Sequence, residues 1–214
     1  MSKDNCGTGE GYSDCALTQA LRERAAEREK PVVRSAAWNA VLCKAKKIEL
    51  LLLDVDGVLT DGTVYYLPEA GEVKGFNTQD GFGLRILQEA GISVGLITAR
   101  NSEAVSRRAR DLKIQHIAAG CSNKAAAYAE LLVQTGLKPE QTAYMGDDWL
   151  DLPVLVKVGC AFAPANAVPE LRQRADYVTE QRGGHGAVRE VCELILEAKG
   201  LLAGIFARHL GGGR

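Results

Sequence analysis

The chain has 214 residues, of which 46% are hydrophobic and 25% are charged, as is usual for a globular domain with its own core. Its formal net charge of −1 gives no electrostatic basis for binding nucleic acid or an anionic membrane. The sequence has neither an apolar stretch long enough to span a membrane nor a signal-peptide pattern, so we expect a cytoplasmic protein.

The first 40 residues are polar and predict an N-terminal extension outside the core domain. Arg and Glu accumulate over 16–30, which predicts a charged helix that ends before Pro31. We expect the core domain over 41–200 and a C-terminal tail over 201–214.

The six cysteines include no Cys-x-x-Cys pair. Four of them lie in apolar stretches, and this favours reduced, buried thiols over disulfides or a zinc site. These four are Cys43, Cys121, Cys160 and Cys192. We expect Cys6 and Cys15, in the polar extension, to be exposed.

Short apolar runs alternate with helical patterns after residue 47, which predicts an α/β fold with a Rossmann-like parallel sheet flanked by helices. The expected strands cover 48–53, 92–97, 114–118, 142–145, 160–163 and 176–178. The expected helices cover 83–89, 102–112, 124–134, 150–156, 168–174 and 187–198. Two extended segments around a turn at 68–71 interrupt this alternation, and they predict a β-hairpin flap over 63–76, directly after the first strand.

Two aspartates, Asp54 and Asp56, follow the leucine run 50–53. An apolar run that stops at acidic residues and a glycine is typical of a buried parallel strand, and ligands of open α/β sheets collect at that strand end. Two carboxylates held together there require a cation, a shared proton or phosphate chemistry. The alternative is an Asx turn, which is common after a strand for a single Asp-Gly.

Three later strands also end in residues suited to phosphate or metal. Thr98 places a hydroxyl before a helix, and Lys124 begins a helix, where a cation is unfavourable unless an anion lies nearby. Each alone has a simpler explanation, a helix cap for Thr98 and a solvated surface lysine for Lys124. Asp147, Asp148 and Asp151 form either an acidic surface turn or a group that a divalent cation neutralises.

Oxygen ligands for a hard cation are available at this edge of the expected sheet. The carboxylates of Asp54 and Asp147, the backbone carbonyl of Asp56 and several waters suit Mg²⁺, with Mn²⁺ or Co²⁺ as alternatives. The sequence therefore predicts a divalent-cation site.

The four segments together resemble the motifs of the haloacid dehalogenase (HAD) phosphatases, in order and spacing, over residues 48–199. They are Asp54-x-Asp56, Thr98, Lys124 and Gly146-Asp147-Asp148-x-x-Asp151. The resemblance implies a HAD-like hydrolase fold in which Asp54 attacks phosphorus and Asp56 serves as general acid and base. Thr98 and Lys124 would hold phosphoryl oxygens. Asp54, Asp56 and Asp147 would bind the metal. Asp148 and Asp151 would orient the metal or its waters.

Within that family, the chain resembles a capless subgroup most closely. Neither the insert after the first motif nor the segment 124–147 has room for a helical cap domain. The segments 56–62, 77–81 and 183–190 resemble the 3-deoxy-D-manno-octulosonate 8-phosphate (KDO 8-phosphate) phosphatases. The resemblance implies a phosphoric monoester hydrolase of lipopolysaccharide precursor synthesis that is a homotetramer, with the hairpin and the C-terminal tail as candidate subunit contacts.

The resemblance also suggests substrate-binding candidates, namely Thr60, Asp61, Asp80, Gly81, Arg100, Gly184, His185 and Arg189. Gly184 allows close approach of backbone to a ligand. Arg189 either grips a sugar-acid carboxylate or is an ordinary surface arginine. His185 is expected to contact substrate or partner, since no second metal-binding residue accompanies it. Two departures from the family pattern bear on the substrate: Ala99 replaces the usual glycine, and Asn77-Thr78-Gln79 stands where related enzymes often place a basic residue.

Two other functions remain open. A phosphatase acting on a nine-carbon acid, KDN 9-phosphate or N-acetylneuraminate 9-phosphate, would carry the same motifs. The structural alternative is a non-catalytic oligomerisation module, similar to the HAD-like domain appended to animal acylneuraminate cytidylyltransferases. Such a module could lose Asp54, Asp56 or Lys124, and all three are present.

Overall fold

The structure is a computed structural model that describes residues 14–28, 32–68 and 71–211. The chain divides into two units, Met1–Ser35 and Ala36–Arg214, and each is described by itself. In the first unit, α1 (Asp14–Arg28) covers most of the expected charged helix, and Leu17 and Leu21 on it are exposed.

A six-stranded parallel sheet forms the centre of the second unit, with the strand order β5-β4-β1-β6-β7-β8. Its strands, all at predicted positions, are β1 (Leu50–Leu53), β4 (Ser93–Ile97), β5 (His116–Ala118), β6 (Thr142–Met145), β7 (Cys160–Ala163) and β8 (Tyr177–Val178). Leu53 at the end of β1 pairs with Leu96 of β4 and Met145 of β6. The strand order reverses at β1, so the strand ends carrying the motifs meet where α/β sheets bind ligands.

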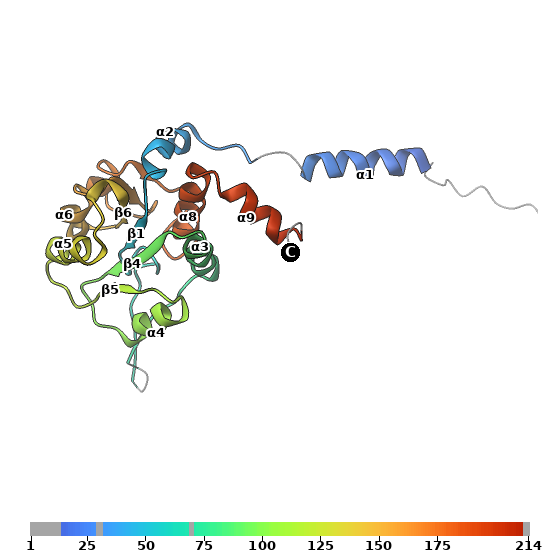
Figure 1. Cartoon of the computed structure of the whole chain (residues 1–214). Helices are drawn as coiled ribbons and strands as arrows, with labels where there is room; N and C mark the ends of the chain where they lie inside the picture. Colours follow the sequence, from blue (N-terminus) through green and yellow to red (C-terminus); the bar gives the residue numbers. More distant parts are fainter. Residues whose placement is uncertain (1–13, 29–31, 69–70, 212–214) are drawn as a thin grey trace, which may run out of the picture. The chain divides into compact units, whose positions relative to one another are not determined.

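Helices cover both faces of the sheet (Figure 1). One layer contains α2 (Ala36–Ala45), α3 (Thr78–Glu89), α4 (Glu103–Asp111), α8 (Ala187–Ala198) and α9 (Leu202–His209). The other contains α5 (Lys124–Thr135), α6 (Leu152–Leu155) and α7 (Pro169–Arg172), with the short 3₁₀ turns η1 (Pro139–Gln141) and η2 (Trp149–Asp151) nearby. Successive leucines of β1 alternate between the two cores, Leu51 facing one and Leu52 the other. Burial on both faces explains why β1 is an unbroken leucine run.

The core unit begins at Ala36, whereas the sequence led us to expect the extension to run to residue 40. Trp38 and Val41 of α2 are each only 3% exposed, and the Trp38 ring packs edge-on against Tyr177 at 6.0 Å. The expected C-terminal tail contains α9, which buries Ile205 and sets the His209 ring edge-on to Phe82 at 5.4 Å. The sequence pattern predicts neither helix, because each buries only one or two large side chains.

Helix α3 begins five residues before the start that we expected. Asn77 caps it by accepting a hydrogen bond from the Gln79 N–H at 2.7 Å. The sequence did not predict this earlier start, because the first turns contain Gly81 and Gly83 and glycine is a poor helix former.

The predicted hairpin is present. β2 (Tyr65–Leu67) pairs antiparallel with β3 (Gly71–Val73) as a separate two-stranded sheet. Among the described residues it is the only strand or helix inserted between β1 and α3, so no cap domain occurs there. Two aromatic residues of the hairpin, Tyr65 and Tyr66, are 55% and 70% exposed.

The described cysteines with placed side chains are free thiols. Cys160 and Cys192 are buried as predicted, and Cys121 is partly buried. Cys43 is exposed, contrary to our expectation, because α2 turns a different face to the core. The predictions for Cys6 and Cys15 fall outside the residues whose side chains are described. Within the described ranges, no helix is both long and apolar enough to cross a bilayer.

Candidate active site

Asp54 is fixed at the end of β1 by the hydrogen bond from its N–H to the Met145 carbonyl at 2.9 Å. Its side chain lies in a mostly buried position, with the residue 8% exposed. The following loop closes on itself, since the N–H groups of Val58, Leu59 and Thr60 all donate to the Val55 carbonyl. The loop thereby presents the Asp54 carboxylate at the carboxyl edge of the sheet.

Lys124, the first residue of α5, joins two of the predicted aspartates in a buried ion-pair network. Its Nζ lies 2.8 Å from an Asp54 oxygen and 2.6 Å from an Asp151 oxygen. Burial acts to lower the pKa of the ammonium, but the two carboxylates together raise it above its ordinary value. Lys124 is therefore a permanent cation beside Asp54. Its two carboxylate partners offset the unfavourable interaction of a lysine with a helix N-terminus.

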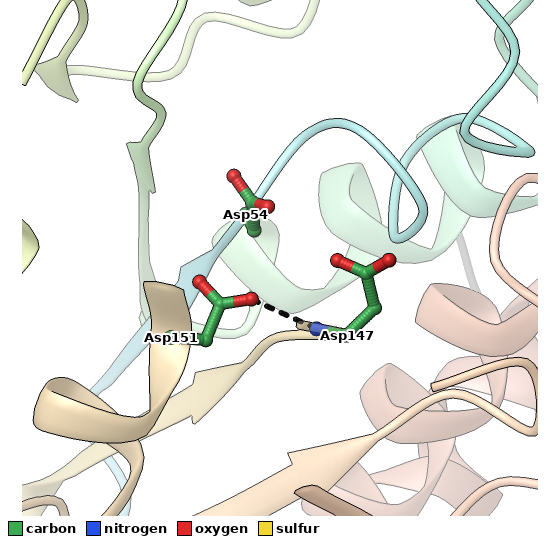
Figure 2. A group of neighbouring side chains, drawn as sticks. All are labelled: Asp54, Asp147 and Asp151. Carbon is green, nitrogen blue, oxygen red and sulfur yellow. Dashed lines mark hydrogen bonds between the residues drawn. The ribbon is translucent and has the colours of Figure 1, made fainter. Parts of the chain in front are cut away.

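Three carboxylates converge at the edge of the sheet: Figure 2 shows Asp54, Asp147 and Asp151. One oxygen from each lies within 4.8 Å of the other two. Burial and then the Asp151 charge raise the pKa of Asp54 to about 6. Burial and then the Asp54 charge raise the pKa of Asp147 to about 7. No ion pair joins Asp147 to any described residue, so this group of oxygens fits a divalent cation.

The oxygens of Asp151 are already occupied. Its Oδ1 accepts from Lys124 and, at 2.5 Å, from the Tyr144 hydroxyl. Its Oδ2 accepts from the N–H groups of Asp147 and Asp148 at 2.9 and 3.2 Å. Asp151 therefore holds the loop that carries Asp147, and its role in orienting the metal stays a prediction. Tyr144, whose position in a buried strand gave no sequence signal, completes this arrangement.

Asp148 is exposed and accepts from the Trp149 N–H at 2.7 Å, where it caps η2. Its carboxylate lies outside the group of three converging oxygens. A contribution of Asp148 to the metal through waters remains a prediction.

Asp56 faces two cations. It is ion-paired with Lys74, and the Arg100 Nε lies 3.5 Å from its Oδ2. The side chain of Lys74 is fully buried and also lies 3.2 Å from Glu72. Sequence reasoning missed Lys74, because only the folding back of the hairpin brings it to Asp56, and the cations hold this carboxylate next to the Asp54 loop.

An open pocket of about 250 Å³ lies at this edge of the sheet. The residues that line it are Asp54, Asp56, Gly62, Thr98, Ala99, Arg100, Lys124, Asp147, Asp148, Leu150 and Asp151. All seven predicted motif residues thus reach one cavity. Thr98 directly follows β4, and its hydroxyl accepts from the Arg100 N–H at 3.3 Å, so it shapes the loop that bounds the pocket.

Of the eight substrate-binding candidates, Arg100 lines the pocket and the other seven do not. Thr60 is completely buried, and its hydroxyl accepts from the Gly62 N–H at 3.2 Å and lies 3.4 Å from the Val55 carbonyl. It is better explained as a brace of the Asp54 loop than as a substrate contact. Asp61 is exposed and accepts from the Thr63 N–H at 2.8 Å.

Asp80 and Gly81 also have structural explanations. Asp80 is 1% exposed and accepts from the N–H groups of Gly186 and Arg189 at 3.2 and 2.8 Å, so it caps α8 from a neighbouring helix. A Cβ at Gly81 would lie 2.2 Å from the Arg108 guanidinium, which donates to the Asn77 carbonyl. Gly81 therefore leaves room for Arg108.

The segment around Gly184 packs directly on the Asp54 loop. Gly184 has φ +69° and donates to the Val58 carbonyl at 2.9 Å, and a Cβ there would lie 2.5 Å from the Asp61 nitrogen. His185 is exposed beside it. Arg189 is ion-paired with Glu193 at 2.7 Å and lies over the Phe82 ring. These contacts favour the interpretation of Arg189 as an ordinary surface arginine over a carboxylate-binding one.

The capping role of Asp80 leads to a stability prediction. We expect Asp80→Ala to lower the free energy of unfolding by about 1–3 kcal/mol, because two buried N–H groups at the start of α8 lose their acceptor. Glu89→Ala, on the same helix in an exposed pair with Arg85, should change it by less than about 0.5 kcal/mol. Urea titration of both variants measures the difference, and equal stabilities would contradict the capping role.

The raised pKa values of Asp54 and Asp147 predict how the metal-free protein responds to pH. Both lie above the ordinary value of 3.8, so the folded state holds protons more tightly than the unfolded state. This contribution to stability is complete below the ordinary value and is lost as pH rises through 6 and 7. In EDTA, the Tm of wild type minus the Tm of Asp147→Asn should therefore fall from pH 5 to pH 8, and a difference that rises would contradict the assignment.

The chain is also similar to proteins of known family. Residues 116–191 match the family model of haloacid dehalogenase-like hydrolases. The chain is 49% identical over 162 residues to the 3-deoxy-D-manno-octulosonate 8-phosphate phosphatase of Escherichia coli (strain K12), covering 76% of this chain and 86% of that protein.

Solved structures agree with this match. The 3-deoxy-D-manno-octulosonate 8-phosphate phosphatase of Moraxella catarrhalis, in complex with magnesium ion, phosphate ion and KDO, superimposes with a TM-score of 0.78 at 42% identity. The match covers 80% of this chain and 98% of that one. The cobalt-bound form of the corresponding Haemophilus influenzae phosphatase gives a TM-score of 0.73 at 39% identity, covering 75% and 94% of the two chains.

Proposed function

The chain belongs to the 3-deoxy-D-manno-octulosonate 8-phosphate phosphatases within the haloacid dehalogenase-like hydrolases, and from this we propose that it hydrolyses KDO 8-phosphate to KDO and inorganic phosphate. The observation that carries the proposal is the single pocket into which all seven motif residues project. In it a buried carboxylate, Asp54, lies 2.8 Å from a buried cation, Lys124. Nucleophile and phosphate ligand are thus adjacent before substrate arrives.

In the first step an Asp54 oxygen attacks the phosphorus, and the bond between phosphorus and the sugar O8 breaks. Asp56 donates a proton to the departing alkoxide, and KDO leaves. Lys124 and the Thr98 hydroxyl hold phosphoryl oxygens during this transfer. The product is an aspartyl-phosphate on Asp54.

In the second step a water attacks the phosphorus of the aspartyl-phosphate. Asp56, now ionised, takes a proton from this water, and the bond between the Asp54 oxygen and phosphorus breaks. Phosphate leaves, and both aspartates return to their starting states. Lys74 and Arg100 fix the position of Asp56 at the pocket, where it faces both the leaving oxygen and the attacking water.

The residues that would hold Mg²⁺ are Asp54, Asp147 and the backbone carbonyl of Asp56, with Mn²⁺ or Co²⁺ as alternatives. When bound, the cation offsets the negative charge between the phosphate and the nucleophile. Asp151 contributes by fixing the Asp147 loop through two N–H groups.

A second candidate substrate is a nine-carbon sugar-acid phosphate, KDN 9-phosphate or N-acetylneuraminate 9-phosphate. The segment 77–79 keeps this alternative open, because it ends in the uncharged, exposed Gln79 where related enzymes often carry a basic residue before Asp80. The reaction and the roles of the motif residues would be the same. The non-catalytic alternative has little support, since every motif residue lines the pocket.

We extend the proposal to a homotetramer that acts in the cytoplasm and serves lipopolysaccharide precursor synthesis. The exposed hairpin residues Tyr65, Tyr66 and Leu67 supply an apolar surface for contact between subunits, and the free thiols suit a reducing compartment. Asp61, Gly184, His185 and Arg189 lie outside the pocket, so we propose that any role in binding substrate involves this assembly. Light scattering during gel filtration should give four times the mass of the chain.

The reaction is tested by incubating the purified protein with KDO 8-phosphate and Mg²⁺. We expect inorganic phosphate and free KDO in equal amounts, and no release of either in EDTA. Phosphate released in the presence of EDTA would contradict the proposed use of a divalent cation.

A further inference from the structure

We propose that Asn166 is a positioning residue for the divalent-cation site, because it ties the loop after β1 to the segment that follows β7. The inference rests on the proposed function in one respect, that Asp54 and Asp147 hold a cation. Asn166 does not line the pocket, so its effect reaches the site through the backbone that it holds.

The Asn166 side chain makes two hydrogen bonds to backbone of two other segments. Its Nδ2 donates to the Gly57 carbonyl at 3.0 Å, and its Oδ1 accepts from the Gly183 N–H at 2.6 Å. A carbonyl can only accept and an N–H can only donate, so these partners fix which way the amide is turned. Asn166 thus links the Asp54 loop, its own segment and the glycine-rich segment before α8.

Gly57 lies against the metal-ligand candidate Asp147. A Cβ on Gly57, which has φ +82°, would lie 2.0 Å from the Asp147 Oδ2 and 2.5 Å from its Cγ. On the other side, a Cβ on Gly183 would lie 1.8 Å from the Gly57 carbonyl oxygen. The Gly57 backbone is therefore held between Gly183 and the Asp147 carboxylate, and a shift of Gly57 toward Asp147 would displace that carboxylate.

The Asn166 segment also holds the main chain of Asp147. The Val168 N–H donates to the Asp147 carbonyl at 2.9 Å. The same three-residue stretch therefore contacts Gly57 through a side chain and Asp147 through the backbone. Since Gly57 shares its loop with Asp54, this stretch sets the separation of the two loops that carry the ligands.

Residues that orient metal ligands without touching the metal commonly change metal affinity by one to two orders of magnitude when they are replaced. Loss of the Asn166 amide would let the Asp54 loop and Gly183 move apart. We therefore expect weaker cation binding and little effect on the chemical step once the site is filled.

The test compares Asn166→Ala and Asn166→Asp with wild type by calorimetric Mg²⁺ titration of the full chain without substrate. Asn166→Asp keeps an acceptor for the Gly183 N–H. It loses the donor to Gly57 and places a carboxylate oxygen against the Gly57 carbonyl. It also serves if the alanine variant fails to fold. The control is Gln173→Ala, an exposed position at the end of α7.

We expect the Mg²⁺ dissociation constant to rise roughly 10-fold in both Asn166 variants and to be unchanged in the control. At saturating Mg²⁺, kcat should return to within about threefold of wild type. Unchanged affinity in both variants, or a kcat that stays low at saturating Mg²⁺, would overturn the inference while leaving the proposed function intact. A wild-type protein that binds no divalent cation would overturn both.

Discussion

Asp54→Asn is expected to remain folded and to lose phosphate release almost completely, with kcat reduced roughly 10⁴-fold or more. The amide has the shape of the carboxylate, but its oxygen is a poor nucleophile toward phosphorus. Asp151, the carboxylate that shares Lys124 with Asp54, is not free to replace it, since its oxygens are occupied by Lys124, Tyr144 and two N–H groups.

The same substitution should not destabilise the metal-free protein at neutral pH. The pKa of Asp54 is raised to about 6, so its ionised form is less favourable in the folded state than in the unfolded state. Removing that charge relieves the repulsion with Asp151. Phosphate release and Tm in EDTA measure the two effects, with exposed Asp111→Asn as the control. Activity near that of wild type would show that Asp54 is not the nucleophile.

Lys124→Met is expected to lower both catalysis and stability. Its ammonium is the cation shared by Asp54 and Asp151, and the residue is only 5% exposed. Its removal leaves two buried carboxylates without their partner, which should lower the free energy of unfolding by about 3 kcal/mol. The phosphate also loses a ligand, so kcat/KM should fall by roughly 10²- to 10⁴-fold.

The matched control is Lys157→Met, since Lys157 is an exposed lysine just beyond α6. Urea unfolding and steady-state kinetics on both variants, at saturating Mg²⁺, separate the two effects. A Lys124→Met protein as stable as the control would contradict the buried ion-pair network. A full kcat/KM would contradict its role as a phosphate ligand.

The parts of the site that lie at strand ends can be predicted from sequence. Buried strands such as β1 are apolar runs, and the polar residue that follows each one necessarily lies at the carboxyl edge of a parallel sheet. Asp54, Thr98 and Asp147 follow from this rule alone. Lys124 follows from its unfavourable place at a helix start.

The parts that depend on contacts between distant segments could not be predicted. Lys74 reaches Asp56 only because the hairpin folds back, and nothing in its local sequence signals burial. The local sequence around Asp80 indicates only an acidic residue in a loop or at a helix start. In the structure its carboxylate oxygens accept hydrogen bonds from N–H groups more than 100 residues later in the chain. Thr60 likewise looks available to a ligand until the loop closes over its hydroxyl.

The resemblance to a family, as distinct from the local patterns, predicted substrate-binding residues of which only Arg100 lines the pocket of the single chain. Arg189 is engaged by Glu193 and Phe82, and His185 lies outside the pocket. Both are consistent with an assembly in which neighbouring subunits complete the site. Local physics thus accounts for the chemistry of the pocket.

The most direct test of the central claim is the ratio of kcat/KM for KDO 8-phosphate to that for N-acetylneuraminate 9-phosphate and KDN 9-phosphate, at saturating Mg²⁺. Asp54→Asn protein serves as the blank. We expect KDO 8-phosphate to be favoured by at least roughly 100-fold, a difference of about 2.7 kcal/mol in transition-state binding. A preference for either nine-carbon substrate, or no turnover of any of the three by folded, Mg²⁺-bound protein, would contradict the proposed function.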